Sequence, residues 1–290
     1  MNPGISILNA SGCVDALTAP DVARSLDVFV TKTVTPLPRE GNPPPRIAEA
    51  GEWMLNSIGL QNPGIDAWCA ESFPRLRELE IPIWVSVGGF SAADYALVCE
   101  RLDELDSVEA IELNLSCPNV EEAPETAAEL VAASRLATRK ALYAKLSPAT
   151  SDIAEAARAV EAAGADGLSL VNTVRGLALD PQTLRPRLAR GSGGLSGPAL
   201  LPLALHCVQA CARAVELPIV GMGGVASGRD ALELVAAGAS AVALGTVLFG
   251  DPLAPARIRA ELAAELEARG VASALEIRGG VRESTHFLTS

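Results

Sequence analysis

Short apolar runs alternate with longer amphipathic segments along the whole chain. We expect a buried strand where apolar, β-capable residues run for about four to eight positions, and a helix where apolar residues recur every three or four positions. The predicted strands are 28–33, 56–60, 81–87, 110–115, 141–146, 167–172, 218–222 and 241–245. The predicted helices are 46–54, 66–79, 92–105, 124–139, 152–163, 198–215, 227–237 and 255–269.

Eight strands separated by helices predict an α/β protein with a parallel (β/α)8 barrel, and a doubly wound sheet is the alternative. Gly164 and Gly238 each follow an alanine-rich helix end and precede a strand, which is typical of the left-handed residue that ends a helix. No linker divides the sequence, so we expect residues 1–290 to form a single domain. The short N-terminal part is predicted to cover the bottom of the barrel.

Composition narrows the class of protein. Apolar residues make up 49% of the 290 residues, but no long uncharged apolar run predicts a membrane span. The net charge of −12 argues against nucleic acid or an anionic membrane as a partner. The N-terminus lacks the pattern of a secretory signal, so a cytoplasmic protein is expected.

The histidines and cysteines exclude several kinds of site. The two histidines, His206 and His286, make a histidine-dependent triad or metal site improbable. None of the six cysteines forms a C-x-x-C pair, and their spacing fits no common zinc or iron–sulfur pattern. We therefore expect free thiols and no bound metal. Five of them, Cys117 excepted, are interpreted as small buried side chains.

Lysine is scarce, because 20 of the 23 basic residues are arginines. Of the three lysines, Lys32 and Lys145 lie in predicted apolar strands, whereas Lys140 lies at a helix end. A compact ammonium suits a tight pocket against a ring nitrogen or a phosphate better than a guanidinium does. Lys32 and Lys145 are therefore candidate site residues.

The segment 111–119 reads as a buried strand that stops at Pro118, with Asn114 and Asn119 on either side of Cys117. Ligands of parallel α/β proteins bind at the carboxyl ends of the strands. Carboxamides offer a donor and an acceptor to a planar ring with amide edges, and a thiol can move a proton. This strand end is the strongest candidate for chemistry.

Glycines follow two late strands, in the segment 221–224 and at Gly245. Bared backbone amides after the seventh and eighth strands of a barrel form a common phosphate site. A helix is predicted to begin at Ser227, with Asp230 placed for a capping box. The alternative is that the glycines only make tight turns. The dinucleotide fingerprint of a Rossmann fold is absent.

Five motifs carry a family resemblance: Asn-Ser-Ile-Gly-Leu-Gln-Asn-Pro-Gly at 56–64, Leu-Asn-Leu-Ser-Cys-Pro-Asn at 113–119, Lys-Leu-Ser-Pro at 145–148, Gly-Gly-Leu-Ser-Gly-Pro at 193–198 and Gly-Met-Gly-Gly-Val at 221–225. In this order they resemble class 1 dihydroorotate dehydrogenases, most of all the catalytic subunit of class 1B. The resemblance implies a barrel that binds FMN and oxidises dihydroorotate to orotate in pyrimidine biosynthesis. Cys117 would take the proton from C5, and the hydride of C6 would pass to flavin N5.

The resemblance also implies roles for individual residues. Cys117 and Lys32 would be catalytic. The substrate-binding residues would be Lys32, Asn56, Ile58, Gly59, Leu60, Asn114, Asn119, Asn172 and Thr173. The FMN-binding residues would be Ala10, Ser11, Gly12, Lys32, Thr33, Ser86, Asn114, Lys145, Val171, Gly197, Gly223, Gly224, Gly245 and Thr246.

Partners and alternatives follow from the same comparison. Class 1B relatives pass electrons to a separate subunit that carries FAD and a [2Fe–2S] cluster, so we expect a homodimer or a heterotetramer with such a subunit; use of fumarate would instead indicate class 1A. The segment after Asn119 is shorter than in the family, which bears on lid closure and substrate identity. The alternatives are an enzyme acting on another dihydropyrimidine, a Schiff-base aldolase using Lys145, and a flavin-binding subunit without catalysis.

Overall fold

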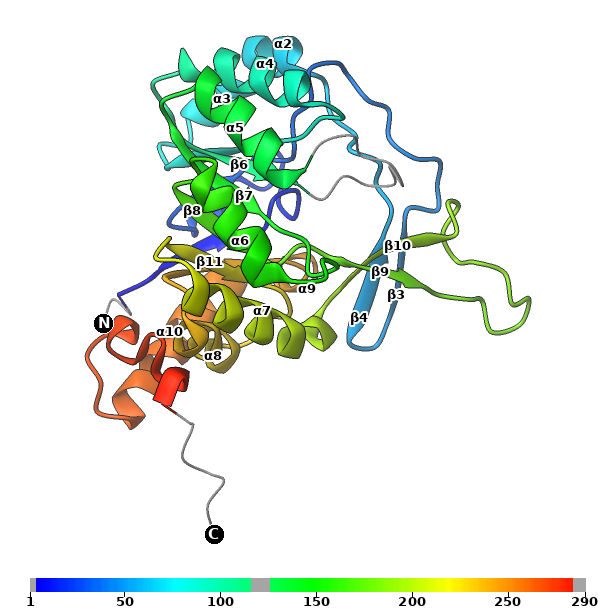
Figure 1. The fold of residues 1–290 in the computed structure, drawn as a ribbon. Coiled ribbons are helices and arrows are strands. Elements are labelled where there is room, and N and C mark those ends of the chain that lie inside the picture. Colours follow the sequence, from blue (N-terminus) through cyan, green and yellow to red (C-terminus); the bar gives the residue numbers. More distant parts are fainter. Residues whose placement is uncertain (1–3, 116–125, 284–290) are drawn as a thin grey trace.

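Eight parallel strands form the centre of the molecule (Figure 1). The computed structural model describes residues 4–115 and 126–283. Around the sheet the order is β1-β12-β11-β8-β7-β6-β5-β2, which confirms the (β/α)8 barrel. The strands are β1 (Ser6–Asn9), β2 (Phe29–Val30), β5 (Ile83–Val87), β6 (Val108–Asn114), β7 (Ala141–Lys145), β8 (Gly167–Leu170), β11 (Ile219–Met222) and β12 (Ala241–Leu244).

The barrel closes between β1 and β2, and side chains help to close it. A parallel bridge joins Leu8 to Val28. Beyond it, the carboxamide of Asn9 takes the place of a peptide group: its Nδ2 donates to the carbonyl of Val30, and its Oδ1 accepts from the Val30 N–H, both at 2.8 Å. On the other edge of β2, the N–H groups of Phe29 and Thr31 donate to backbone carbonyls in and just before β5. Asn9 therefore satisfies the backbone groups that face the seam.

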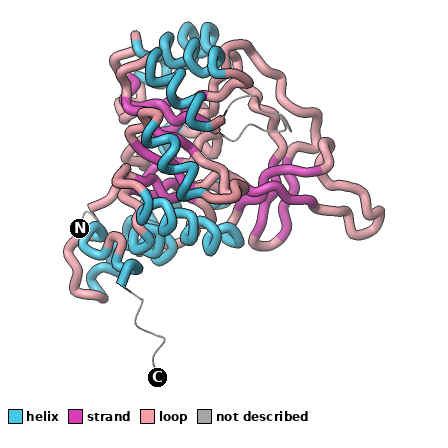
Figure 2. The backbone as a smooth tube through the Cα atoms, viewed as in Figure 1, coloured by secondary structure: helices cyan, strands magenta, loops and turns pink. Residues whose placement is uncertain are grey.

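Helices surround the barrel as an outer layer (Figure 2). The longer ones are α4 (Ala92–Asp103), α5 (Ala127–Ala137), α6 (Ile153–Ala162), α7 (Leu201–Ala214), α8 (Gly228–Ala237) and α10 (Ala254–Ala268). Short α-helices are α1 (Pro20–Arg24), α2 (Ile65–Ala67), α3 (Phe73–Arg77) and α9 (Val247–Gly250). The described residues also form a π-helix, η1 (Trp68–Ser72), and the 3-10 helices η2 (Pro198–Leu200), η3 (Ala274–Ile277) and η4 (Gly280–Glu283).

Helix ends follow the predicted signals. The Ser227 side chain accepts from the Asp230 N–H while Asp230 accepts from the Ser227 N–H, so the capping box before α8 is confirmed. Gly164 and Gly238 have φ values of 102° and 134°, which confirms their place at helix ends. Within the described residues, no helix has the length and apolar character needed to cross a membrane.

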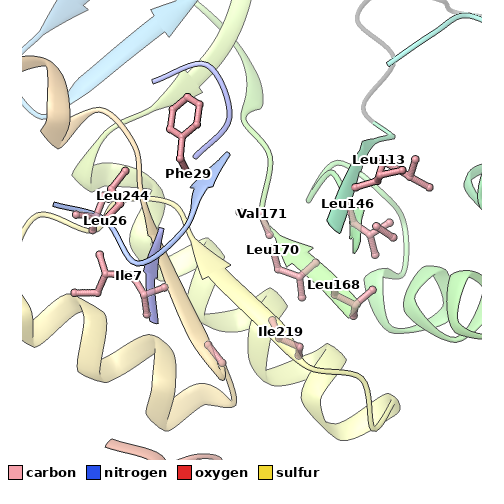
Figure 3. Close-up of a cluster of buried hydrophobic side chains, with 14 of the residues drawn as sticks. Ile7, Leu26, Phe29, Leu113, Leu146, Leu168, Leu170, Val171, Ile219 and Leu244 are labelled. Atoms are coloured by element: carbon pink, nitrogen blue, oxygen red, sulfur yellow. The ribbon is translucent and has the colours of Figure 1, made fainter. Parts of the chain in front are cut away.

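Alternate residues along the strands face two different cores. Ile7, Leu168, Ile219 and Leu244 belong to the large cluster between the strands and the helices (Figure 3). Their neighbours, which include Leu8, Val30, Val220, Met222 and Ala243, form a smaller cluster inside the barrel. Trp84 and Tyr143 pack on that inner cluster, with ring centroids 4.2 Å apart. The interior is thus filled by side chains on the side below the carboxyl ends of the strands.

A second, antiparallel sheet stands beside the barrel, on the right in Figure 1. It consists of β3 (Ile47–Ala50), β4 (Trp53–Asn56), β10 (Ser192–Ser196) and β9 (Val174–Leu177), in that spatial order. The pairing of β4 with β10 joins segments nearly half the chain apart. This sheet forms one wall of the site described below.

Three predictions about these elements are wrong. The N-terminal part does not simply cover the barrel, because Ser6–Asn9 is its first strand. The predicted helix 46–54 is a hairpin of β3 and β4, which pair across the turn at Gly51, where φ is 57°. The predicted strand 56–60 ends at Asn56, because Gly59 and Leu60 adopt positive φ values of 77° and 57° that no strand allows.

Candidate active site

A cavity of about 650 Å³ opens at the carboxyl ends of the barrel strands. Its walls come from loops that follow seven of the eight barrel strands and from the antiparallel sheet. The lining includes the predicted residues Ala10, Ser11, Gly12, Lys32, Thr33, Asn56, Ile58, Gly59, Leu60, Asn114, Lys145, Val171, Asn172, Thr173, Gly197, Gly223, Gly224, Gly245 and Thr246. Residues that the sequence assigned to one site from distant motifs therefore share one cavity.

Lys145 ends β7 and points into the barrel interior at the cavity floor. Its Nζ lies 2.9 Å from Ser11 Oγ and 3.2 Å from Glu112 Oε1. The side chains of this ion pair are 6% and 1% exposed, for Lys145 and Glu112 respectively. Two fixed partners hold the ammonium in place, so it presents a positive charge at a defined position in the cavity.

A chain of amides and hydroxyls crosses the cavity wall. Asn172 Nδ2 donates to Asn114 Oδ1 at 2.9 Å, and Asn114 Nδ2 donates to Thr33 Oγ1 at 3.3 Å. Thr33 Oγ1 lies 3.0 Å from Ser86 Oγ, which is fully buried. Ser86 is therefore behind Thr33 and does not line the cavity, although it was predicted to contact the cofactor. The orientation of each amide is fixed by the next member of the chain.

The loop that follows β4 is held by Asn42, which also lines the cavity. The Asn42 N–H donates to the carbonyl of Ile58 at 2.9 Å, and Asn42 Nδ2 donates to Ser57 Oγ at 2.9 Å. A Cβ at Gly59 would lie 2.6 Å from the Asn42 nitrogen, so only glycine fits this approach. Contacts with Asn42 thus fix the backbone of the loop at residues 57–59.

The glycine loops of the late strands meet the beginning of α7. Gly223 and Gly224 have φ values of 116° and 85°, and a Cβ at Gly224 would lie 2.6 Å from the Leu201 nitrogen. Gly197, at φ 101°, precedes η2 and α7. Backbone amides and a helix N-terminus together favour a bound anion such as a phosphate.

The cavity is also lined by a thiol that was not predicted there, and two lysines act on it electrostatically. Cys13 lines the wall, and its pKa is raised by loss of solvent around the thiolate, although Lys145 and Lys32 oppose that shift. Burial lowers the pKa of Lys32, an effect that Cys13 opposes and Lys145 reinforces. The two ammonium groups therefore act on each other, and both act on the Cys13 thiol, within one region of low solvent access.

Two predicted site residues lie outside the described residues, and the cysteines divide between the core and the cavity. Cys117 and Asn119 lie outside the described residues. Cys99, Cys207 and Cys211 are buried in the outer core, as predicted, but Cys13 belongs to the cavity. No group of three or more potential metal ligands occurs in residues 4–115 and 126–283.

The sequence reasoning missed Glu112, and a signal was available. It is a carboxylate between Ile111 and Leu113 in the buried part of β6, two residues before Asn114 and therefore on the same side of the sheet. The reasoning applied to a lysine within an apolar strand extends to a glutamate in the same setting.

Comparison with known proteins gives consistent results. The family model described as "Dihydroorotate dehydrogenase" matches residues 2–266. Three relatives are named "Dihydroorotate dehydrogenase B (NAD(+)), catalytic subunit". The protein of Listeria monocytogenes serovar 1/2a is 42% identical over 290 residues, 95% of each chain. That of Trichlorobacter lovleyi is 46% identical over 263 residues, 88% of this chain and 86% of the relative. That of Geobacillus kaustophilus is 42% identical over 293 residues, 96% and 93% respectively.

Proposed function

Because this chain belongs to the dihydroorotate dehydrogenase family, we propose that it oxidises dihydroorotate to orotate in pyrimidine biosynthesis, with FMN as its resident cofactor. The observation that carries this proposal is the single cavity in which Lys32, Lys145 and the amides of Asn114 and Asn172 meet. Membership of this family disfavours the aldolase alternative. An enzyme acting on another dihydropyrimidine would use the same residues, and preferential binding of uracil over orotate would identify it.

The residues present fit FMN. A volume of about 650 Å³ lies within the usual range of cofactor and ligand sites. Gly224 brings its backbone close to the start of α7, where a phosphate would be stabilised, and Gly197, Gly223, Gly245 and Thr246 line the same cavity. Lys145 and Ser11 would contact the isoalloxazine. When bound, FMN supplies the acceptor for the hydride of C6, at flavin N5.

The substrate would be held by amides and backbone groups. Orotate and dihydroorotate present alternating donors and acceptors, and the linked amides of Asn114 and Asn172 offer both. Asn56 would add a third amide from β4. The loop at Gly59 and Leu60, fixed by Asn42, would offer N–H groups to the carboxylate. Ile58, Thr173, Asn119 and Lys32 complete the proposed set.

Cys117 is proposed as the general base that removes the C5 proton. The C5 proton would pass to the thiolate, and the C6 hydrogen would leave as hydride on the opposite face of the ring. The thiol then holds one proton, the hydride carries the second proton with both electrons, and the C5=C6 double bond of orotate forms. A thiol can do this near neutral pH when its pKa is lowered by nearby cations. We propose Lys32, which lines the cavity, as the cation in this role.

The test of the base compares two cysteine substitutions. Cys117→Ser should keep FMN bound but slow flavin reduction by dihydroorotate by about 10²–10⁴-fold, because a serine hydroxyl is a far weaker base. Cys69→Ser is the matched control, since Cys69 lies in η1 and does not line the cavity. Rapid mixing without oxygen measures the rate. An unchanged rate for Cys117→Ser would remove this thiol from the mechanism.

The relatives' name "catalytic subunit" implies that they work with another subunit. We propose that this chain, as a cytoplasmic homodimer, joins a subunit with FAD and a [2Fe–2S] cluster in a heterotetramer that reduces NAD. Support comes from the class 1B-like motifs and from the lack of a dinucleotide fingerprint in the sequence. Turnover with NAD should require the added subunit. Full turnover of the isolated chain with fumarate would contradict this part of the proposal.

A further inference from the structure

Glu112 is a buried carboxylate with no obvious structural purpose. It lies in β6, faces the barrel interior, and its side chain is 1% exposed. Tyr143 lies in register beside it, and Trp84 and aliphatic side chains fill the rest of the interior. Burying a carboxylate costs several kilocalories per mole that an ion pair rarely more than repays, so an apolar residue would serve a packed barrel at least as well. The charge therefore calls for a functional reason.

In the ion pair, Lys145 is the partner that faces the cavity, and Glu112 lies beneath it. Register pairs Asn114 of β6 with Lys145 of β7, which places Glu112 one inward position below that pair. Lys145 lines the cavity, whereas Glu112 is not among the described residues that line it. Nζ of Lys145 lies 3.2 Å from Glu112 and 2.9 Å from Ser11 on the loop after β1. Glu112 can therefore affect a bound molecule only through Lys145 or through its electric field.

A polar side chain on the neighbouring strand β8 also indicates that the barrel interior has a function at the depth of Lys145. Ser169 of β8 pairs in register with Lys145. Its Oγ is buried and has no hydrogen-bond partner among the described residues. Unpartnered polar atoms of this kind are uncommon and concentrate where a site is specialised. The interior thus changes from apolar to polar at the depth of Lys145 and Glu112.

We propose that Glu112 is a positioning residue that sets the charge presented by Lys145 to FMN. The carboxylate fixes the ammonium at the cavity floor, and its negative charge partly offsets the positive charge of Lys145. This inference rests on the proposed function, because it requires FMN beside Lys145. Reduction of the isoalloxazine adds negative charge, which a positive neighbour stabilises. Glu112 therefore keeps the flavin easier to re-oxidise than Lys145 alone would, which suits an enzyme that must pass its electrons on.

Two substitutions should move the flavin midpoint potential in opposite directions. Glu112→Gln keeps an acceptor for Lys145 and removes one negative charge, so the potential should rise. Lys145→Met removes one positive charge, so the potential should fall. We expect at least about a tenfold change in the equilibrium between oxidised and reduced flavin for each, which is about 30 mV for a two-electron couple. If Glu112 had only a structural role, its substitution would lower stability or FMN affinity, and the midpoint potentials of the two variants would not shift in opposite directions.

The experiment titrates purified FMN-loaded protein against a reference dye and measures FMN Kd separately by the fluorescence of free FMN. The double variant Glu112→Gln, Lys145→Met should lie between the singles. Glu233→Gln, which removes the same charge from the surface of α8, is the matched control and should leave the potential unchanged. A potential for Glu112→Gln that is unchanged, or lowered as in Lys145→Met, would overturn the inference.

A second variant allows the test to be made even if Glu112→Gln does not fold. If Glu112→Gln does not fold, Glu112→Asp withdraws the carboxylate from Lys145 by one methylene, so a smaller rise is expected, and no rise overturns the inference. The wild-type protein separates this result from the proposed function. If it binds FMN and dihydroorotate reduces the flavin, the function stands whatever Glu112→Gln shows. If it binds no FMN, both proposals are overturned.

Discussion

Replacing Asn9 by alanine should open the seam of the barrel. The Asn9 carboxamide is fully buried and makes two 2.8 Å hydrogen bonds to the backbone of Val30. Alanine would leave a buried N–H and a buried carbonyl without partners, at about 1–3 kcal/mol each. The free energy of unfolding should fall by about 2–6 kcal/mol, a large part of the roughly 5–15 kcal/mol of a typical domain.

Urea denaturation followed by tryptophan fluorescence measures this loss. The midpoint should fall while the slope m stays constant, because the surface exposed on unfolding hardly changes. Gln182→Ala, which removes an exposed amide, is the control and should have almost no effect. Asn9→Asp keeps an acceptor for Val30 N–H but loses the donor, so it should also be destabilised. An Asn9→Ala protein within about 0.5 kcal/mol of the wild type would refute the role of this seam.

The same substitution should weaken cofactor binding. β1 leads directly to Ser11, and β2 leads to Lys32, so the Asn9 bonds align two loops of the cavity. Because binding requires that alignment, FMN Kd should rise even at temperatures where Asn9→Ala remains folded. Equal Kd values for the folded variant and the wild type would limit Asn9 to a stabilising role.

Two further predictions concern other parts of the molecule. Gly224→Val should lose at least about tenfold in FMN affinity, because φ of 85° costs a β-branched residue about 1–3 kcal/mol and its Cβ would meet the Leu201 nitrogen. Gly280→Ala, in open space, is the control in equilibrium dialysis. Burial raises the pKa of Cys99 and of Cys211 to about 12, so both stay protonated at neutral pH. Peptide mass mapping should find them alkylated only after unfolding; equal labelling of native protein would contradict this.

The sequence predicts the barrel well where strands are apolar on both faces. Runs such as 81–87, 141–146 and 218–222 are unambiguous because a parallel strand is buried by helices outside and side chains inside. Ser6–Asn9 escapes this signal because it begins with an exposed serine and ends with a buried asparagine, which leaves only two apolar residues in the strand. The segment 46–54 contains alanine and glutamate, which favour a helix, and its pairing with β10 lies far along the chain.

The sequence predicts which motifs form the site, but it predicts less well which buried side chains reach the cavity. Glycines, amides and lysines at strand ends can be read from the sequence, since the topology brings every carboxyl end to one face. Which inward side chains reach the cavity depends on packing: Ser86 stays behind Thr33, and Cys13 reaches the wall. The partnership of Lys145 with Glu112 spans 33 positions, so no local pattern reveals it.

The central claim is that one cavity holds FMN against dihydroorotate. An absorbance spectrum of the purified protein without oxygen, recorded before and after dihydroorotate is added, tests it most directly. We expect a bound oxidised flavin whose visible absorbance bleaches, with one orotate released per flavin. Protein that carries no flavin after incubation with FMN, or a bound flavin whose spectrum stays unchanged with dihydroorotate, would contradict it.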